Sequence, residues 1–150
     1  MSVIEKKLKE LDIVLPEASA PAAKYSNFAI VNGLLYVSGK GPSGNPRGKL
    51  GKEFTTEQGY EFAKQAGIEV LAVIKDALGS LDKVKRVVKI QGFINSSAEF
   101  EEPHKVLNGC SDLMLEVFGH KGDHARSVFG ANSLRDQLPI VVDSIFEIEE

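Results

Sequence analysis

The sequence predicts an α+β fold, a two-layer sandwich in which two long helices cover one face of a mixed β-sheet. Two segments carry apolar residues at helical spacing, and about five shorter segments are rich in β-branched residues. Their order is hairpin, helix, strand, helix and two strands. With 150 residues, of which 43% are hydrophobic, the chain can form one core and has little room for a second. We therefore expect a single domain over residues 1–150.

Residues 1–20 are expected to form a short helix followed by an extended arm. Ser2 and Glu5 match a helix capping box. Apolar residues then recur at helical spacing until Pro16, which ends the pattern. The arm continues to about residue 27 and is rich in small residues and proline.

A hairpin is predicted next, because Asn32-Gly33 stands between two apolar runs and favours a tight two-residue turn. The two runs are Phe28–Val31 and Leu34–Val37. The segment from Gly39 to Phe54 follows, with five glycines and two prolines. This composition predicts a loop.

Two amphipathic helices follow the loop, and the predicted strand Val84–Ile94 lies between them. Thr55 or Thr56 can cap the first helix, and Gly79 suits the left-handed residue that closes it. The second helix is predicted to begin at Phe100 and to end at Gly119.

Three further strands are predicted, and the sheet that they complete has one face without helices. These strands are Val84–Ile94, Ala125–Ala131 and Ile140–Ile148. The apolar residues expected on the uncovered face are Tyr36, Ile90, Val128 and Ile145. Because a large exposed apolar patch is unusual in a small monomer, we expect an oligomer.

Composition and charge argue against several classes of protein. The chain has 18 basic and 21 acidic residues and a formal charge of -3, so no general attraction to nucleic acid is expected. Cys110 is the single cysteine, which excludes an intramolecular disulfide and a multi-cysteine metal site. No run approaches the roughly 18 apolar residues of a membrane span. We expect a cytoplasmic protein without a metal or cofactor.

Two histidines near the end of the second predicted helix are candidate metal ligands. His120 and His124 have the spacing of a helical metal site, but Gly119 and Gly122 would break such a helix, which favours surface histidines. Strand alternation would place His124 on the same side as Arg126. There His124 could adjust the charge near the arginine.

Several motifs occur together in an order that resembles the reactive intermediate deaminases, the RidA or YjgF family, often described as L-PSP endoribonucleases. These motifs are Tyr25-Ser26, Leu35-Tyr-Val-Ser-Gly39, Gly79-Ser-Leu-Asp82-Lys-Val84 and Ala125-Arg126-Ser127. The resemblance covers roughly Pro21 to Ile148. It implies a chorismate-mutase-like homotrimer with a central barrel, in which ligand sites lie between subunits. Such an assembly would cover the open sheet face.

The resemblance also implies a reaction, the hydrolysis of small 2-imino or enamine acids to 2-oxo acids and ammonia. Arg126 matches the arginine that holds the substrate carboxylate, and a guanidinium suits this role because its planar donors grip a carboxylate in two parallel hydrogen bonds. Tyr25 is expected to lean into the cleft. Ser38 and Gly39 are expected to present a hydroxyl and a main-chain N–H at its floor.

Two residues of the second predicted helix are candidates for one position of the site. The family carries an asparagine on the second helix, and Asn108 and Ser111 are both plausible matches across one turn. We assign Ser111.

Each of these residues also has a simpler structural explanation. Arg126 could pair with Asp143 or another acid across neighbouring strands. Tyr25 could pack on the hairpin with its hydroxyl in water, and Ser38-Gly39 could be an ordinary strand end.

Val141 stands where the family has a glutamate that helps to position the attacking water. A valine can neither accept a proton nor orient water, and strand parity makes Asp136 and Glu147 poor substitutes. No residue is therefore assigned as catalytic. The sequence supports an imine hydrolase first, and a non-catalytic binder of small carboxylates as the alternative. An endoribonuclease is less favoured, although Lys40, Arg47, Lys49 and Lys52 could form a local basic rim.

Overall fold

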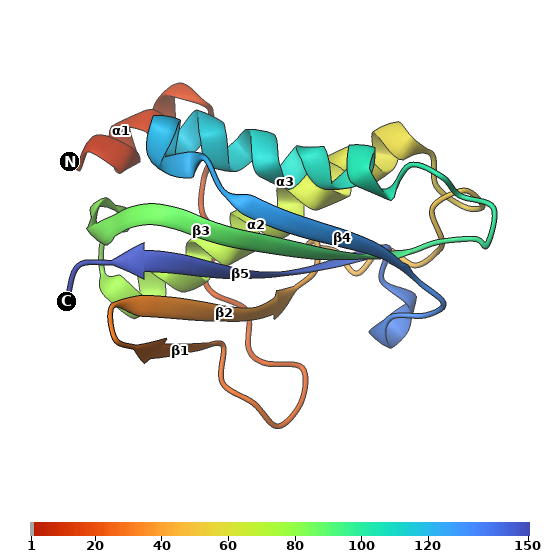
Figure 1. Cartoon of the computed structure of the whole chain (residues 1–150), viewed down its shortest axis with the longest axis horizontal. Coiled ribbons are helices and arrows are strands. Elements are labelled where there is room, and N and C mark those ends of the chain that lie inside the picture. Colours follow the sequence, from red (N-terminus) through yellow and green to blue (C-terminus); the bar gives the residue numbers. More distant parts are fainter. Residues whose placement is uncertain (1) are drawn as a thin grey trace.

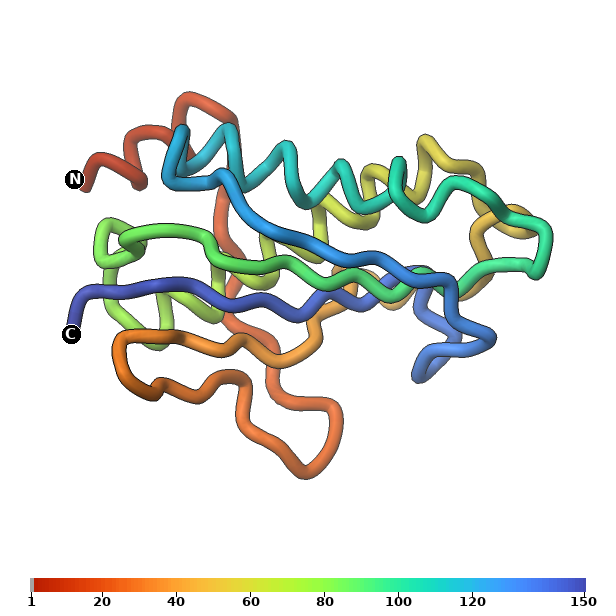
Figure 2. The backbone as a smooth tube through the Cα atoms, viewed as in Figure 1, coloured from red at the N-terminus to blue at the C-terminus, as the bar shows by residue number. Residues whose placement is uncertain are grey.

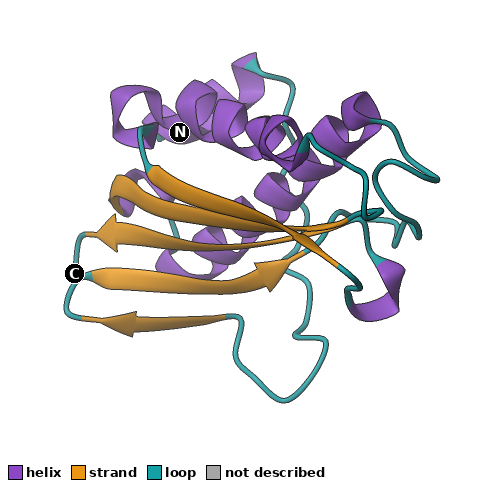
Figure 3. Cartoon of the chain, turned by 45° about the vertical axis from the view of Figure 1, so that its right-hand side comes forward, coloured by secondary structure: helices purple, strands orange, loops and turns teal. Residues whose placement is uncertain are grey.

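The structure is a computed structural model that describes Ser2–Glu150. A five-stranded mixed sheet is covered on one face by two long helices (Figures 1 and 3). The predicted two-layer α+β architecture is confirmed. The helices are α1 (Val3–Glu10), α2 (Thr56–Leu78) and α3 (Pro103–Phe118), and the strands are β1 (Phe28–Val31), β2 (Leu34–Lys40), β3 (Val84–Asn95), β4 (Ala125–Ala131) and β5 (Ile140–Ile148).

The strand order across the sheet is β1-β2-β5-β3-β4. Only β3 and β4 run parallel, joined through α3, and the other neighbouring pairs are antiparallel. β4 therefore forms one edge of the sheet and β1 the other. Figure 2 shows the arm crossing from the helix layer to the β1 edge.

The helix boundaries follow from local sequence, with two corrections. α1 ends at Glu10 rather than near Pro16, because Asp12 has a left-handed backbone (φ 57°) that no helix continues. α3 begins at Pro103 rather than Phe100. A proline suits the first helical position, since its missing N–H would have no partner there.

The other predicted helix ends are confirmed. Thr55 caps α2 in a complete capping box with Gln58, and Gly79 closes the helix with φ 80°. The Ser2 hydroxyl accepts from the N–H of Glu5 at the start of α1. The predicted hairpin also forms, with Asn32 and Gly33 both at positive φ.

The assignment of side chains to sheet faces differs from expectation in β3 and β4. Ile90 is fully buried (0% exposed), and Val128 packs against the core under the helices. A register shift between Val87 and Lys89 breaks the alternation of β3. Gly92 pairs with Val128 in the parallel ladder. The side chains of β4 therefore face the same sides of the sheet as their partners on β3.

The uncovered face still carries apolar side chains. Tyr36 and Phe129 are 41% and 52% exposed, and the ring of Phe129 lies beside Phe93 with a centroid distance of 6.1 Å. Val141 and Ile145 are half-buried on β5, where alternate residues face the helices. The expectation of an apolar open face is therefore correct, although two of its members were wrong.

α2 and α3 approach each other closely at Gly109. A methyl group at this position would lie 2.0 Å from the carbonyl oxygen of Tyr60. Beside this contact the Tyr60 hydroxyl donates to the Asp112 carboxylate at 2.6 Å, and this hydrogen bond raises the pKa of Tyr60 to about 12. Within Ser2–Glu150, no helix has the length and apolar character needed to cross a membrane.

Candidate functional site

Arg126 lies on the edge strand β4 and points toward α3. Its parallel partner is Ile90, a core residue, so both side chains face the helix layer. The guanidinium Nη1 donates to the Ser111 hydroxyl at 3.0 Å, and Nη2 donates to the main-chain oxygen of His104 at 2.8 Å. Arg126 is half-buried and held along one side of α3.

The guanidinium keeps donors for a ligand. It has five N–H groups, of which two meet Ser111 and His104, and Arg126 forms no ion pair within residues 2–150. The alternative pairing with Asp143 is excluded, because β3 separates their strands and Asp143 faces the opposite side of the sheet. Burial raises the pKa of the Asp143 carboxyl.

Of the two helix candidates, the one that contacts Arg126 is Ser111. It is 8% exposed, whereas Asn108 is exposed. Nε2 of His124 lies 2.9 Å from the Ser111 hydroxyl, so His124 and Arg126 share one side as alternation predicted. His104, Ser111, His124 and Arg126 together are called the Arg126 half-site. No sequence motif indicates the role of His104, which contributes only its main-chain oxygen.

Ser38 and Gly39 lie on β2, and Tyr25 lies in the arm that Ser38 contacts. The Tyr25 hydroxyl accepts from the N–H of Ala22 at 3.1 Å and the ring is 42% exposed. The Ser38 hydroxyl donates to the oxygen of Ser26 at 2.6 Å, and its N–H donates to the oxygen of Asn27. Both donors of Ser38 thus tie the strand to the arm.

Val141 is the neighbour of Gly39. A methyl group at Gly39 would lie 2.6 Å from Cγ1 of Val141, so only glycine permits this approach. Glu147 pairs with Leu34 at the far end of β2, and the exposed Asp136 pairs with Arg135 at 3.2 Å. Neither acid replaces the missing glutamate. Tyr25, Ser38, Gly39 and Val141 are called the Gly39 half-site.

Lys40 holds the arm that carries Tyr25. It is 4% exposed, and its amine donates to the main-chain oxygen and hydroxyl of Ser19 and to the amide oxygen of Asn27, at 2.8–3.0 Å. Burial lowers the pKa of the Lys40 amine and raises the pKa of the Glu69 carboxyl. The negative charge of Glu69 opposes the lowering at Lys40. The sequence analysis placed Lys40 in a local basic rim, whereas the structure buries it as the last residue of β2.

Lys49, a second residue of the predicted basic rim, also has its amine bonded within the chain. Its amine donates to the side-chain oxygen of Asn95 at 2.8 Å and to the main-chain oxygen of Asn132. Two of the four basic side chains are therefore engaged inside the fold.

The two half-sites do not meet in one chain. β5 and β3 lie between β2 and β4, and neighbouring strands are about 4.8 Å apart, which separates β2 from β4 by about 14 Å. Val141 also faces the open side of the sheet, whereas Arg126 faces the helices. The two half-sites therefore cannot form one site within a single chain.

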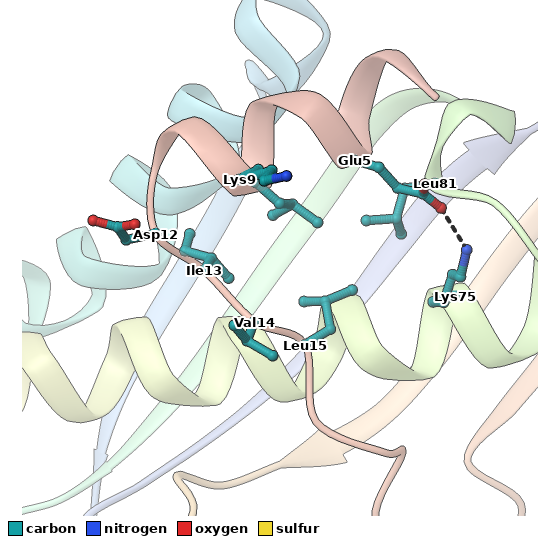
Figure 4. A pocket seen from close by; sticks show the side chains of 9 residues that line it. Glu5, Lys9, Asp12, Ile13, Val14, Leu15, Lys75 and Leu81 are labelled. Atoms are coloured by element: carbon teal, nitrogen blue, oxygen red, sulfur yellow. Dashed lines mark hydrogen bonds and ion pairs between the residues drawn. The ribbon is translucent and has the colours of Figure 1, made fainter. Parts of the chain in front are cut away.

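A separate cavity of about 330 Å³ lies between α1, its return segment and α2 (Figure 4). Its walls include Leu8, Leu15 and Leu81, and the ion pair between Glu5 and Lys75 (2.8 Å) stands at one end. None of the predicted site residues lines it, so it is not the candidate site.

The chain is similar in sequence and in structure to several known proteins. The model of a family described as "YjgF/chorismate mutase-like, putative endoribonuclease" matches residues 5–143. The chain is 39% identical to Protein TCP17 of Trypanosoma cruzi, over 97% of this chain and 94% of that protein. The crystal structure of Atu1372 from Agrobacterium tumefaciens, a protein of unknown function, is 41% identical with a TM-score of 0.90, over 98% and 93% of the two chains. A structure from Shewanella oneidensis, also described as a putative endoribonuclease, is 29% identical with a TM-score of 0.94, over 98% and 100%.

Proposed function

Because the chain belongs to the YjgF/chorismate mutase-like family, we propose that it hydrolyses small 2-imino or enamine acids to 2-oxo acids and ammonia. The reaction would take place at sites between the subunits of a homotrimer. Arg126 would hold the substrate carboxylate, and the Gly39 half-site of a neighbouring subunit would close the cleft.

The observation that carries this proposal is the half-buried guanidinium of Arg126. It has no acidic partner within residues 2–150, yet Ser111 and the oxygen of His104 fix its orientation. Such a group binds a carboxylate well, since its charge is permanent and its remaining N–H groups are planar. The orientation is prepared before the ligand arrives, which reduces the entropy that binding would cost.

A trimer is proposed because the half-sites lie apart and the open face is apolar. Covering Phe129, Tyr36 and Phe93 in a central barrel would remove their exposed surface from water. We expect a mass of about 49 kDa in sedimentation equilibrium, three times the 16.3 kDa of the chain. A monomer at micromolar concentration would contradict both the trimer and the shared site.

A non-catalytic binder of small carboxylates is the second candidate, and the position of Val141 beside Gly39 favours it. The same anchor would bind 2-oxo acids, but this half-site would supply no base. An endoribonuclease has less support, because Lys40 and Lys49 direct their amines into the fold.

The anchor is tested by calorimetric titration of pyruvate, a small 2-oxo acid. Arg126→Ala should weaken binding by about 10-fold or more, since charged hydrogen bonds contribute about 1.5–3 kcal/mol. Arg126→Lys should bind with intermediate affinity, because an ammonium cannot make the planar pair. Arg86→Ala is the matched control, since Arg86 also donates to a main-chain oxygen, that of Asp123 at 3.3 Å. Equal affinity in the wild type and Arg126→Ala would exclude Arg126 as the anchor.

A further inference from the structure

The proton positions at His124 follow from its two contacts. Nδ1 lies within hydrogen-bonding distance of the main-chain oxygen of Gly122, and Nε2 lies 2.9 Å from the hydroxyl of Ser111. A carbonyl oxygen only accepts hydrogen bonds, so Nδ1 must carry the proton. In the neutral ring, Nε2 then presents a lone pair to Ser111.

The direction of the Ser111 hydroxyl proton follows from the contact of its oxygen with Arg126. Nη1 of Arg126 lies 3.0 Å from Oγ and can only donate. The hydroxyl therefore accepts from Arg126 and donates to Nε2 of His124. Serines within helices commonly donate to a main-chain oxygen of the preceding turn, whereas the Ser111 hydroxyl meets His124 and Arg126.

A hydroxyl that donates to an imidazole, whose other nitrogen is fixed by a third group, is the arrangement that activates serine and water in hydrolases. Here it stands against the guanidinium proposed as the carboxylate anchor. The carbon that reacts in a 2-imino acid is bonded directly to that carboxylate. A substrate on Arg126 would therefore bring its reacting carbon beside Ser111.

We propose that His124 is the base of the Arg126 half-site and takes the proton of the attacking water through the Ser111 hydroxyl. This inference rests on the proposed hydrolysis of 2-imino acids. It assigns to His124 and Ser111 the function that Val141 cannot perform. Ser111 contacts the water, and His124 acts behind it.

A single imidazole can carry out every proton transfer that the reaction needs. Water oxygen bonds to the imine carbon, the C=N electron pair moves to nitrogen, and the water proton passes through Ser111 to Nε2 of His124. The imidazolium returns a proton by the same route to the nitrogen, which gives a carbinolamine. The carbinolamine hydroxyl then loses its proton along this path as the C–N bond breaks, and the nitrogen gains a proton and leaves as ammonia.

The charged and titratable groups next to His124 lie on β3, β4 and α3, and Asp123 precedes it in the chain. Arg126 on β4 shares Ser111 with it, and Arg86 on β3 donates to the main-chain oxygen of the adjacent Asp123. From α3, Cys110 is the neighbour of Ser111, and burial raises the pKa of its thiol to about 12, which keeps it neutral. The base therefore works next to a permanent positive charge.

The test compares His124→Gln with His120→Gln. Glutamine keeps a polar side chain at position 124 but cannot carry the proton, and His120 is an exposed histidine four residues earlier. Imine hydrolysis is measured in a coupled assay, in which an amino-acid eliminase supplies the 2-imino acid, between pH 5.5 and 8.5 with the uncatalysed rate subtracted. Pyruvate affinity is measured on the same samples.

We expect His124→Gln to lower kcat by about 100-fold, with pyruvate affinity within threefold of the wild type. The dependence of kcat on pH between 5.5 and 8.5 should differ from that of the wild type in His124→Gln and stay unchanged in His120→Gln. Unchanged kcat and pH dependence in His124→Gln would overturn the inference. So would an equal loss of pyruvate binding and turnover, because that result indicates a purely structural role.

Pyruvate binding and imine hydrolysis together distinguish the role of His124 from the role of Arg126. If the wild type binds pyruvate through Arg126 but does not hydrolyse imines, the anchor stands and His124 is not a base. If it binds no pyruvate, the proposed function fails first. Nitrogen-15 NMR of the imidazole in the ligand-free protein gives a separate check. We expect the proton on Nδ1 and a change of the Nε2 signal in Ser111→Ala, whereas a proton on Nε2 in the neutral ring would overturn the inference without any substrate.

Discussion

In the His124→Gln background, replacing Val141 by glutamate should raise the rate of 2-imino acid hydrolysis by about 100-fold to 10,000-fold, the usual contribution of a positioned general base. Val141 is half-buried and lies beside Gly39. A carboxylate there would be partly removed from water, which raises its pKa toward the range in which it accepts protons well at neutral pH. The rate is measured in the coupled imine assay.

The size of the increase depends on the base that the chain already has. If His124 takes the proton in the wild type, the increase should be largest in the His124→Gln background, where Val141→Glu restores turnover. Val141→Gln is the control, because it matches glutamate in size and cannot accept a proton. An equal increase with glutamate and glutamine would show that polarity alone, and not proton transfer, limits the site.

Gly109→Ala should destabilise the protein by about 3 kcal/mol or more, at the upper end of the range for overpacked positions. The added methyl group would lie 2.0 Å from the Tyr60 carbonyl oxygen and 3.1 Å from the main-chain nitrogen of Lys64. Both atoms belong to the backbone of α2, so a whole helix must move. The better helix propensity of alanine, worth about 1 kcal/mol, offsets only part of this cost. We expect a melting temperature lower by about 6–12 °C at equal protein concentration.

Gly67→Ala is the matched comparison for this prediction. It makes the same substitution between the same two helices, but its methyl group would meet the ends of the Leu113 and Cys110 side chains, at 2.8 and 3.2 Å. These atoms can shift by rotation about side-chain bonds, so the loss of stability should be smaller. Similar melting temperatures for the two variants would contradict the close backbone contact at Gly109.

Much of the fold could be predicted from the sequence, because its signals are local. Asn32-Gly33 specifies a tight turn, Gly79 ends α2 at a left-handed residue, and the order of apolar patterns determines the order of helices and strands. The two helix ends that were predicted wrongly also have local causes, the left-handed Asp12 and the proline at position 103. Periodicity alone does not locate such breaks.

The candidate site could be predicted only in part. Arg126 follows from its motif, and alternation placed His124 on the same side. The sequence makes both Ser111 and Asn108 plausible partners of Arg126, because they lie within one helical turn. The rotation of α3 about its axis, which its packing on the sheet sets, brings Ser111 to Arg126. The burial of Lys40 against Ser19 and Asn27 joins residues that are distant along the chain.

The helices and strands, their order and the position of Arg126 in a strand follow from the amino-acid sequence, because these features depend on neighbouring residues along the chain. The tertiary structure alone decided which face each strand residue occupies, through the register shift in β3 and the parallel pairing that orients Val128 and Arg126. It also decided that Arg126, Ser111 and His124 share one set of hydrogen bonds while Gly39 and Val141 lie across the sheet. The physical reason is that register and helix rotation minimise the energy of the whole packed core, and no single segment contains that information.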